Sequence, residues 1–337
     1  LENGIILTAD LSYTKDINGA HVQNWGLGTP SEVLNTGFDT RPVYNTDTDK
    51  AMVFGAPTNA YVFSNSNKGR IWNVSLKGQK TFDNGLYTSL AYSYLNAKDV
   101  NSIEAEITGD AFAFNPALGN VNNDVLAFSR YGDTHRIIGV ISKEFKYGSD
   151  KWATTVSSFF EYAQGGRFNY TYGGDINNDG SNLNDLLYIP TSAEVNQMVF
   201  SGAPAEQAAQ AAAFEAFIRQ DDYLSERRGE YAERYGALAP WRSRWDIKIL
   251  QDYHFKVSPD RTNTIQLSID ILNVGNLISS NWGLVQQPNN VQPLGVTLDP
   301  VTYEPTYTFN TALGETFVYD SSLLSRWQAQ FGIRYIF

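Results

Sequence analysis

The sequence predicts an all-β fold: a segment of a transmembrane antiparallel up-and-down β-barrel, with about eight long strands and long extracellular loops, one of which contains short helices. Three observations predict it. Apolar and polar residues alternate over strand-length segments, tight turns alternate with long connections, and the chain ends on an amphipathic strand whose last residue is Phe337. Because successive side chains of a strand point to opposite faces, each segment offers one face to lipid and one to water.

The alternation defines seven regular segments in chain order. Their apolar residues are Ile5, Leu7, Ala9, Leu11 and Tyr13; Trp72, Val74 and Leu76; Leu86, Leu90, Tyr92 and Tyr94; Trp152, Val156, Phe160 and Tyr162; Trp245, Ile247, Ile249, Tyr253 and Phe255; Ile265, Leu267, Ile269 and Ile271; and Trp327, Ala329, Phe331, Ile333, Tyr335 and Phe337. An eighth segment, residues 135–145, is less regular, because isoleucine and valine fall on both faces. The charged residues of the opposite faces are Asp10, Lys77, Glu161, Asp246, Lys248, Asp252, Asp270 and Arg334.

The connections alternate between short and long. The short ones are rich in Gly, Asn, Asp, Ser and Pro, as hairpin turns are; they are residues 82–85, 147–150 and 257–262. The long ones exceed ordinary connection lengths and cover roughly residues 16–68, 99–133, 173–240 and 278–323. Outer-membrane barrels have this asymmetry, with turns in the periplasm and loops outside. We therefore expect a bacterial outer-membrane location, with the long loops extracellular and the C-terminus periplasmic.

The charges on the polar faces indicate the size of the barrel. An eight-stranded barrel has an interior only wide enough to be filled by side chains, so we favour a segment of a larger, water-filled barrel over a complete small one. No stretch approaches the roughly 18 to 20 consecutive apolar residues of a transmembrane helix, which leaves a closed barrel as the way to cross a bilayer. The alternative is a soluble β-sandwich with one buried face, but it gives no reason for the aromatic ending.

Composition excludes several functions. The 337 residues contain no cysteine, which removes disulfides, thiolate metal sites and cysteine nucleophiles. The net charge of -11 argues against a nucleic-acid partner, because phosphate binding needs a basic face. His21, His135 and His254 are far apart in sequence, and no His-Glu-x-x-His, Gly-x-Ser-x-Gly or Walker sequence occurs. We therefore expect that the protein is not an enzyme.

The long loop of residues 173–240 has helical patterning. Residues 204–218 are dense in alanine and start with Pro204, which suits a first helical turn, while Phe214, Phe217 and Ile218 form one apolar face. A second short helix is predicted over residues 222–234. These helices could cap a ligand entrance, but packing on the barrel rim is the simpler interpretation and the one we favour.

The same loop contains a partial calcium motif. Asp175, Asn177 and Asp179 are at the first, third and fifth positions, and Gly180 at the sixth permits the sharp turn around the ion. The twelfth position is a leucine, with Asp185 one residue earlier, so the match to an EF-hand is incomplete. A turn stabilised by Asn and Asp side chains explains the same residues and is favoured. If calcium binds, Asp175, Asn177, Asp179 and Asp185 are the candidate ligands; no other cofactor is expected.

Aromatic residues fall into two groups. Those near strand ends suit the belts that anchor barrels at lipid headgroups; they are Trp72, Trp152, Trp241, Trp245 and Trp327. Those in or near the long loops are Trp25, Tyr44, Phe112, Tyr131, Tyr170, Tyr172, Trp282, Tyr303, Tyr307 and Phe309. Exposed rings can stack on sugars or peptides, but sequence does not show which of these rings are exposed.

Several motifs resemble the C-terminal half of Oar-like TonB-dependent outer-membrane transporters. They follow in order along nearly the whole chain: SNSNKG at 64–69, LNAKDVN at 95–101, YGGDINNDG at 172–180, NDLLYIP at 184–190, RRGEYAER at 227–234, APW at 239–241, DILNVGNL at 270–277, NWG at 281–283 and WQAQFGIRYIF at 327–337. No single motif is decisive; their order carries the resemblance.

The resemblance implies a barrel of about 22 strands whose lumen is filled by an N-terminal plug. TonB would deliver energy through a short box ahead of that plug, and neither plug nor box is visible in residues 1–337. We therefore interpret the chain as the C-terminal portion of the barrel, beginning within a fold at Leu1, with the plug, TonB and outer-membrane lipid as partners. The substrate is unknown. The alternative function is a passive porin, or an adhesin or structural barrel, without TonB coupling.

The closing strand carries a further expectation. Ile333, Tyr335 and Phe337, at alternate positions up to the terminus, resemble the C-terminal signal that the outer-membrane assembly machinery reads. Strand counting independently places this end on the periplasmic side, where that machinery acts. We therefore predict that these three residues direct membrane assembly.

Overall fold

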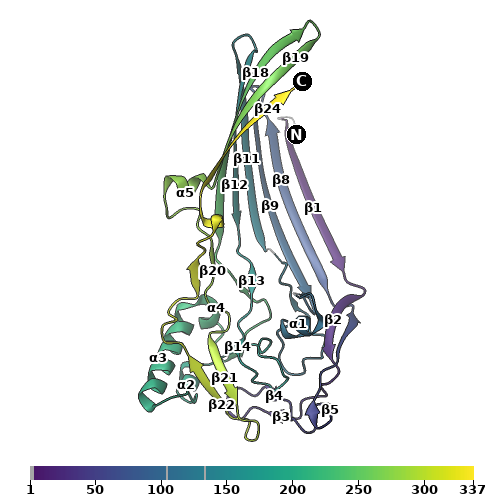
Figure 1. Cartoon of the computed structure of the whole chain (residues 1–337), viewed down its shortest axis with the longest axis vertical. Helices are drawn as coiled ribbons and strands as arrows, with labels where there is room; N and C mark the ends of the chain where they lie inside the picture. Colours follow the sequence, from purple (N-terminus) through teal and green to yellow (C-terminus); the bar gives the residue numbers. More distant parts are fainter. Residues whose placement is uncertain (1–3, 104, 133) are drawn as a thin grey trace.

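The computed structural model describes residues 4–103, 105–132 and 134–337. Leu1, where we expected the chain to begin within a fold, lies outside the described residues, as do two positions of a predicted long connection, 104 and 133. Long strands form a curved sheet, and the connections gather in a layer at one of its ends (Figure 1). No helix in the described part of the chain is long and apolar enough to span a membrane.

Eight long strands form one antiparallel sheet in the order in which they occur. They are β1 (Ile5–Lys15), β8 (Arg70–Thr81), β9 (Leu86–Asp99), β11 (His135–Tyr147), β12 (Trp152–Ala163), β18 (Arg242–Ser258), β19 (Arg261–Leu272) and β24 (Gln328–Ile336). The short β10 (Ala127–Phe128) also pairs with β9. Within the described residues, β1 and β24 are the two edges of this sheet. The predicted all-β class with a large antiparallel sheet is confirmed.

The pairing register gathers the apolar residues on one side, which we call the apolar face. On four neighbouring strands Val156 faces Ile249, Ile249 faces Ile269, and Ile269 faces Phe331. Directly opposed residues of antiparallel strands share a face, so these four side chains form one row. The predicted charged residues lie on the opposite side, the polar face, where Lys248 faces Asp270.

The irregular segment at 135–145 follows the same rule. In β11, Ile137 faces Tyr92 on one side and Tyr162 on the other, so it belongs to the apolar face. Its neighbour Ile138 is opposite Glu161 and so belongs to the polar face. The noisy alternation in the sequence therefore reflects apolar residues placed on both faces of a regular strand.

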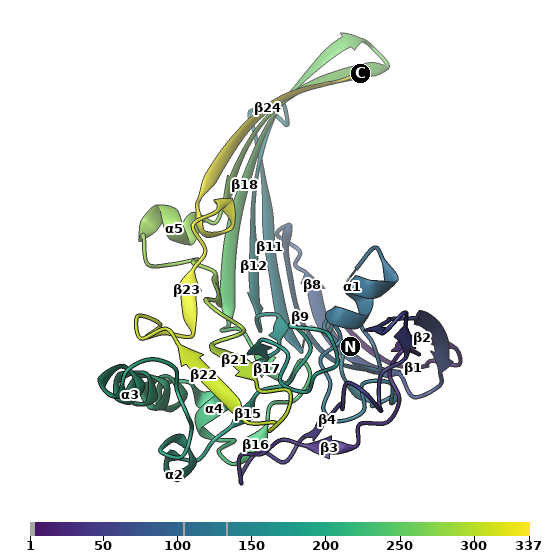
Figure 2. The same ribbon diagram turned by 60° about the horizontal axis from the view of Figure 1, so that its bottom comes forward.

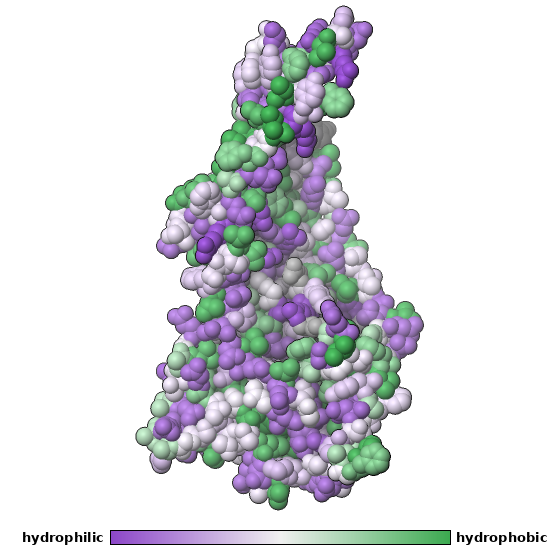
Figure 3. Space-filling model, viewed as in Figure 1, coloured by the Kyte–Doolittle hydropathy of each residue, from purple (hydrophilic) through white to green (hydrophobic). Residues whose placement is uncertain are grey.

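The apolar face is open to its surroundings. Leu90, Phe331 and Ile333 expose 62%, 75% and 77% of their surface, although they lie within the sheet. Figure 3 shows hydrophobic side chains interspersed with hydrophilic ones along the narrow part of the molecule built from strands. The sheet therefore presents a broad apolar surface that no other part of the described chain covers.

Short and long connections lie at opposite ends of the sheet. The tight turns join β8 to β9, β11 to β12 and β18 to β19, and we call this the turn end. The long connections span residues 16–69, 100–134, 164–241 and 273–327, close to the predicted ranges, and gather at the loop end. The C-terminus marked in Figure 1 lies towards the turn end. Ile5 and Ile336, near the two ends of the described chain, pair with Lys80 and Thr264 beside two of the turns.

The long connections build a loop layer of short elements. Its paired strands are β2 (Gly19–Asn24) with β7 (Tyr61–Ser66), β3 (Glu32–Val33) with β4 (Pro42–Val43), β5 (Met52–Val53) with β6 (Ala56–Pro57), β13 (Arg167–Phe168) with β17 (Ala237–Leu238), β15 (Tyr188–Ile189) with β16 (Glu230–Tyr231), β20 (Gln286–Pro288) with β23 (Phe317–Tyr319), and β14 (Tyr172–Gly173), β21 (Leu294–Leu298) and β22 (Pro305–Phe309) together. Its helices are α1 (Thr108–Ala113), α2 (Ser192–Val195), α3 (Pro204–Gln220), α4 (Asp222–Ser225), α5 (Val274–Ile278) and the 3-10 turn η1 (Leu323–Ser325). Figure 2 shows the layer extending from α3 on one side to β2 on the other.

The larger hydrophobic core of the molecule lies in this loop layer. Leu34, Tyr172, Phe214, Leu294 and Phe309 are all buried within one cluster, although they come from three different connections. A smaller cluster forms around α1 and β2. The molecule therefore has a layer with its own packed interior at one end of a sheet whose apolar face is exposed.

The predicted helix at 204–218 is confirmed as α3. Pro204 occupies its first turn, and the buried Phe214 and Phe217 pack on Phe309 with ring centroids 5.3 and 5.7 Å apart. The predicted second helix at 222–234 is wrong beyond Ser225, where α4 ends.

The reason for this difference is a glycine in a non-helical conformation combined with a distant partner. Gly229 adopts a φ of +82°, which a continuing right-handed helix does not allow. The next two residues, Glu230 and Tyr231, form β16 and pair with β15. Pairing with a strand about 40 residues away in sequence therefore replaces the local helical preference.

Candidate functional site

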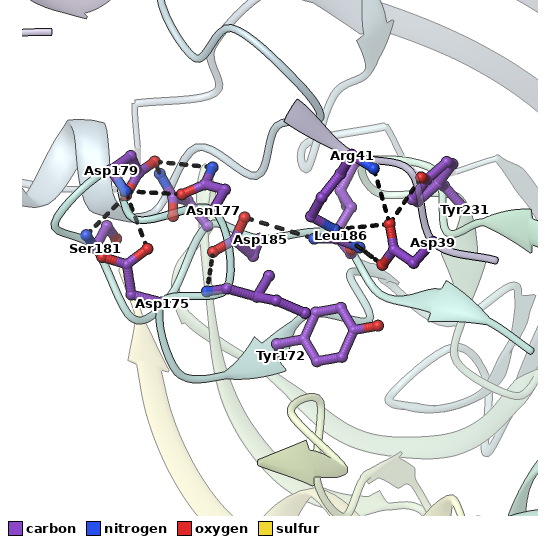
Figure 4. A network of polar contacts seen from close by, with 12 residues as sticks. Asp39, Arg41, Tyr172, Asp175, Asn177, Asp179, Ser181, Asp185, Leu186 and Tyr231 are labelled. Atoms are coloured by element: carbon purple, nitrogen blue, oxygen red, sulfur yellow. Dashed lines mark hydrogen bonds and ion pairs between the residues drawn. The ribbon is translucent and has the colours of Figure 1, made fainter. Parts of the chain in front are cut away.

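The acidic loop, residues 175–185, joins β14 to β15 in the loop layer (Figure 4). The Asp175 carboxylate accepts hydrogen bonds from the backbone N–H groups of Asp179 and Gly180, at 3.0 and 2.8 Å. Asn177 Oδ1 accepts from Asp179 N–H at 2.9 Å, and Asp179 Oδ1 accepts from Ser181 N–H at 2.8 Å. Gly180 has a φ of +92°, so the sharp turn predicted from this glycine is present. These side-chain turns fold the loop around its own carboxylates.

The candidate residues at the end of the loop turn back to its start. Asp185 Oδ2 accepts a hydrogen bond from Ile176 N–H at 3.1 Å, and Asn184 Nδ2 donates to Asp179 Oδ2 at 2.8 Å. Asp179 and Asp185 expose only 2% and 1% of their surface. The structure therefore brings Asp175, Asn177, Asp179 and Asp185 onto one compact loop.

A buried arginine lies against this loop. The Arg41 guanidinium forms an ion pair with Asp39 at 2.9 Å and donates to the carbonyl of Leu186 at 2.9 Å. The Nη1 atom of Arg41 lies 3.6 Å from Asp185 Oδ1. Burial opposes the charge of Arg41, but Asp39 raises the pKa of Arg41 above its usual range, so it remains a cation. Arg41 thus links the first long connection to the acidic loop (Figure 4).

Aromatic rings enclose Arg41. The guanidinium carbon lies 4.8 Å from the ring centre of Tyr172 and 5.4 Å from that of Tyr231. The Tyr231 hydroxyl donates to Asp39 Oδ1 at 2.8 Å. Sequence reasoning did not single out Asp39, Arg41 or Tyr231 as site residues, because Tyr231 is 192 residues from Asp39 and Leu186 is 145 residues from Arg41. Tyr231 lies in the RRGEYAER motif, but that motif does not indicate its partner.

Burial raises the pKa of three carboxyl groups of the acidic loop. Loss of water, together with the neighbouring Asp175 charge, raises the pKa of Asp179 to about 7. Burial is also the main reason for the raised pKa of Asp175 and of Asp185, and the charge of Asp179 adds to the shift of Asp185. The surrounding protein stabilises the negative charges of these carboxylates poorly. Binding of a proton or a cation at the loop is therefore favourable.

The acidic loop offers oxygen ligands of several kinds. In the described part of the chain, no group of three or more His, Cys, Asp and Glu side chains is arranged to hold a metal ion. A cation bound here would therefore need amide or backbone oxygens as well as carboxylates, and calcium accepts both. The calcium assignment made from sequence remains a prediction.

The polar face of the sheet carries paired charges. Lys248 bonds Asp270 on the next strand at 2.8 Å, and Arg136 bonds Glu161 at 2.6 Å. All four side chains keep some exposure to solvent, so each pair contributes little stability. This face therefore offers a charged, hydrated surface.

Two groups of aromatic rings lie near the ends of the sheet. The group at the turn end contains Trp152, Tyr253, Phe255, Tyr335 and Phe337, whose successive ring centres are 4.5, 5.7, 6.5 and 5.8 Å apart. The group at the loop end contains Tyr92, Tyr94, His135, Tyr162 and Trp241, where the rings of Tyr162 and Trp241 stack at 4.6 Å. Of the predicted belt residues, Trp152 and Trp241 are in these groups.

The closing strand contributes to the group at the turn end. Tyr335 faces Ile265 and Ile333 faces Leu267 on β19, so both belong to the apolar face. Phe337 follows the strand, and the guanidinium of Arg261 lies 5.9 Å from its ring centre. The three predicted assembly residues are therefore exposed side by side at the C-terminal edge of the sheet.

The aromatic residues that the sequence places in or near the long loops differ in burial. Six of them are buried in the loop layer: Tyr44, Phe112, Tyr170, Tyr172, Tyr307 and Phe309. Trp25, Tyr131 and Trp282 are exposed and Tyr303 is partly exposed. Of the ten rings named from the sequence, these four keep a ring surface that a ligand could contact.

The raised pKa of Asp179 predicts a dependence of stability on pH. In the unfolded chain Asp179 releases its proton near 3.8, whereas in the folded loop it holds the proton up to about 7. Between these values the folded state binds more protons than the unfolded state, so stability falls as pH rises. In buffer free of divalent cations, wild type should therefore lose stability relative to Asp179→Asn between pH 4 and 7.

Denaturant unfolding of the full-length protein at several pH values measures this difference. Asp299→Asn is the matched control, because Asp299 also accepts backbone N–H bonds in a turn but is exposed. Parallel pH profiles for wild type and Asp179→Asn would contradict the prediction.

No protein-family model, curated protein or solved structure matches this chain. Its function must therefore be inferred from the residues and the geometry described above.

Proposed function

We propose that this chain is the C-terminal part of the β-barrel of a TonB-dependent outer-membrane transporter, which moves a nutrient or other ligand across the bacterial outer membrane. The apolar face that continues across all eight long strands is the observation that carries the proposal. Contact with water is unfavourable for so much apolar surface. Lipid would cover it, because strands can cross a bilayer when their backbone groups pair within a sheet.

The spacing of the aromatic groups supports a membrane location. Trp152 and Tyr162 lie ten residues apart on β12, one in each aromatic group. Ten residues of a strand cover about 34 Å, and a tilt of about 35–45° reduces this to roughly 24–28 Å of height. Outer-membrane barrels have an apolar band about 25 Å high between two aromatic girdles.

The other face of the sheet supports a wide, hydrated lumen. Its charges are paired on the surface of the sheet, as at Lys248 and Asp270, and they remain partly exposed. Among the described residues, the edges at β1 and β24 have unpaired backbone groups on one side, which lipid could not satisfy. Further strands of the same barrel would pair with both edges and complete the wall. A plug would then occupy the lumen in contact with the polar face.

Several motifs that resemble Oar-like transporters coincide with elements of the loop layer. YGGDINNDG at 172–180 and NDLLYIP at 184–190 form β14, the acidic loop and β15, and RRGEYAER at 227–234 includes β16, which pairs with β15. The resemblance therefore involves segments that contact each other. It favours active transport over a passive porin or an adhesin, which are the alternatives.

Arginine substitutions on the two faces test the membrane location. Val156→Arg places a charge on the apolar face, four residues from Trp152 and six from Tyr162, so it should reduce stability in lipid by about 2–4 kcal/mol. Thr155→Arg is the control, because the adjacent residue points to the polar face and is opposite Glu144. Urea unfolding of the full-length protein in lipid vesicles measures both. Equal effects of the two substitutions would contradict lipid contact.

Coupling to TonB separates transport from the alternatives. The full-length protein should bind the purified periplasmic domain of TonB and should give no steady conductance in a planar bilayer, because a plug fills the lumen. A passive porin would conduct without binding TonB, and an adhesin would do neither. Either of these two results would refute the proposed function.

The C-terminal residue is predicted to direct assembly. Phe337→Ala should reduce the amount of folded protein in the outer membrane, because Phe337, Tyr335 and Ile333 would be read by the assembly machinery. Ile336→Ala, on the opposite face of the strand, is the control. Membrane fractionation with a heat-dependent gel shift measures the folded protein. Wild-type levels of the Phe337 variant would contradict this role.

A further inference from the structure

The acidic loop and its neighbours carry more negative than positive charge. Four carboxylates, those of Asp39, Asp175, Asp179 and Asp185, lie around two cations. Arg41 contacts Asp39 and Asp185, and Lys50, which interacts electrostatically with Asp175 and Asp179, donates to Asn178 Oδ1 at 2.9 Å. When all six groups are ionised, two negative charges remain uncompensated. Buried charges of this kind require a partner.

A buried amide next to these charges has an unused oxygen. Asn184 exposes 1% of its surface, and among the described residues its Oδ1 has no hydrogen-bond partner. The same side chain reaches Asp179, because its Nδ2 donates to Asp179 Oδ2 at 2.8 Å. The two ends of an amide can exchange places without a change of shape. Turning the amide over would bring its oxygen beside the Asp179 carboxylate, and a cation between the two oxygens would satisfy both.

We propose that the acidic loop binds one calcium ion through the side-chain oxygens of Asp175, Asn177, Asp179 and Asn184. Asp185 contributes negative charge close to the ion and is oriented by Arg41 and by Ile176 N–H. All of these donors are oxygens, and two are neutral amides, which suits calcium, with its six to eight oxygen ligands and tolerant geometry. One divalent ion would neutralise the two uncompensated charges.

The position of the loop gives the ion a structural role. Backbone bonds join Asn184 to Ala117 at 2.8 Å and Asn177 to Tyr44 at 2.8 Å, and Gln292 Nε2 donates to the carbonyl of Asn182 at 3.0 Å. The acidic loop therefore contacts the connections at 16–69, 100–134 and 273–327. Calcium would fix the loop on which three of the other connections pack. This inference does not depend on TonB-driven transport.

Titration of the full-length protein tests the site. After removal of divalent ions, calcium chloride should raise the midpoint of thermal unfolding and bind at one ion per chain in calorimetry. Asp179→Asn should weaken this binding at least about tenfold, because it removes a charged ligand. Asp299→Asn, an exposed carboxylate of the loop layer, should bind calcium as wild type does. No calcium-dependent shift at millimolar calcium, or an equal response in both variants, would overturn the proposal.

A gain-of-charge variant keeps the test valid if Asp179→Asn fails to fold. Asn184→Asp adds a third carboxylate to the ligand set, so it should lower the unfolding midpoint without calcium and tighten calcium binding. If the loop is only a turn held by hydrogen bonds, this variant would have a lower unfolding midpoint without calcium but would not bind calcium more tightly. That result would refute the site. Calcium binding by a protein that fails to bind TonB would refute the transport proposal and leave this one intact.

Discussion

The hydrogen-bond register of the long antiparallel strands is the constraint on which the rest of the structure depends. Each strand carries apolar residues at every second position, so a slip of one residue would move that whole set to the other face. The observed pairing keeps Val156, Ile249, Ile269 and Phe331 in one row. The exposed apolar face, the aromatic groups at its two ends and the paired charges behind it all follow from this register.

The sheet and the loop layer are stabilised in different ways. The strands are held by backbone pairing, while their apolar face is left for an environment outside the described chain. The loop layer has a buried core and many buried polar groups, including the ion pair of Asp39 and Arg41. Because this layer contains buried carboxylates, charge as well as packing determines the stability of the acidic loop.

The sequence predicted the sheet well because the signal is local. Alternation along each strand and the Gly- and Asn-rich turns depend on near neighbours, and so does the alanine-rich α3. The loop layer was less predictable. Arg41 donates to Leu186, 145 residues away, and the helix expected beyond Ser225 is replaced by β16, whose partner is distant in sequence. Within the candidate site, the DINNDG motif located the acidic loop and the NDLLYIP motif contains Asn184, but no pattern marked Asn184 as a ligand or identified Arg41.

The loop core also has a consequence for the order of folding. Its residues come from the connections at 16–69, 164–241 and 273–327, which are separated in sequence by pairs of long strands. The sheet brings the ends of those connections together when the intervening strands pair. We therefore expect this core, with its high contact order, to form late in assembly. This core contains residues from the connection after β1 and from the connection before β24. Neither edge strand can therefore separate from the sheet at the loop end without disrupting a packed interior.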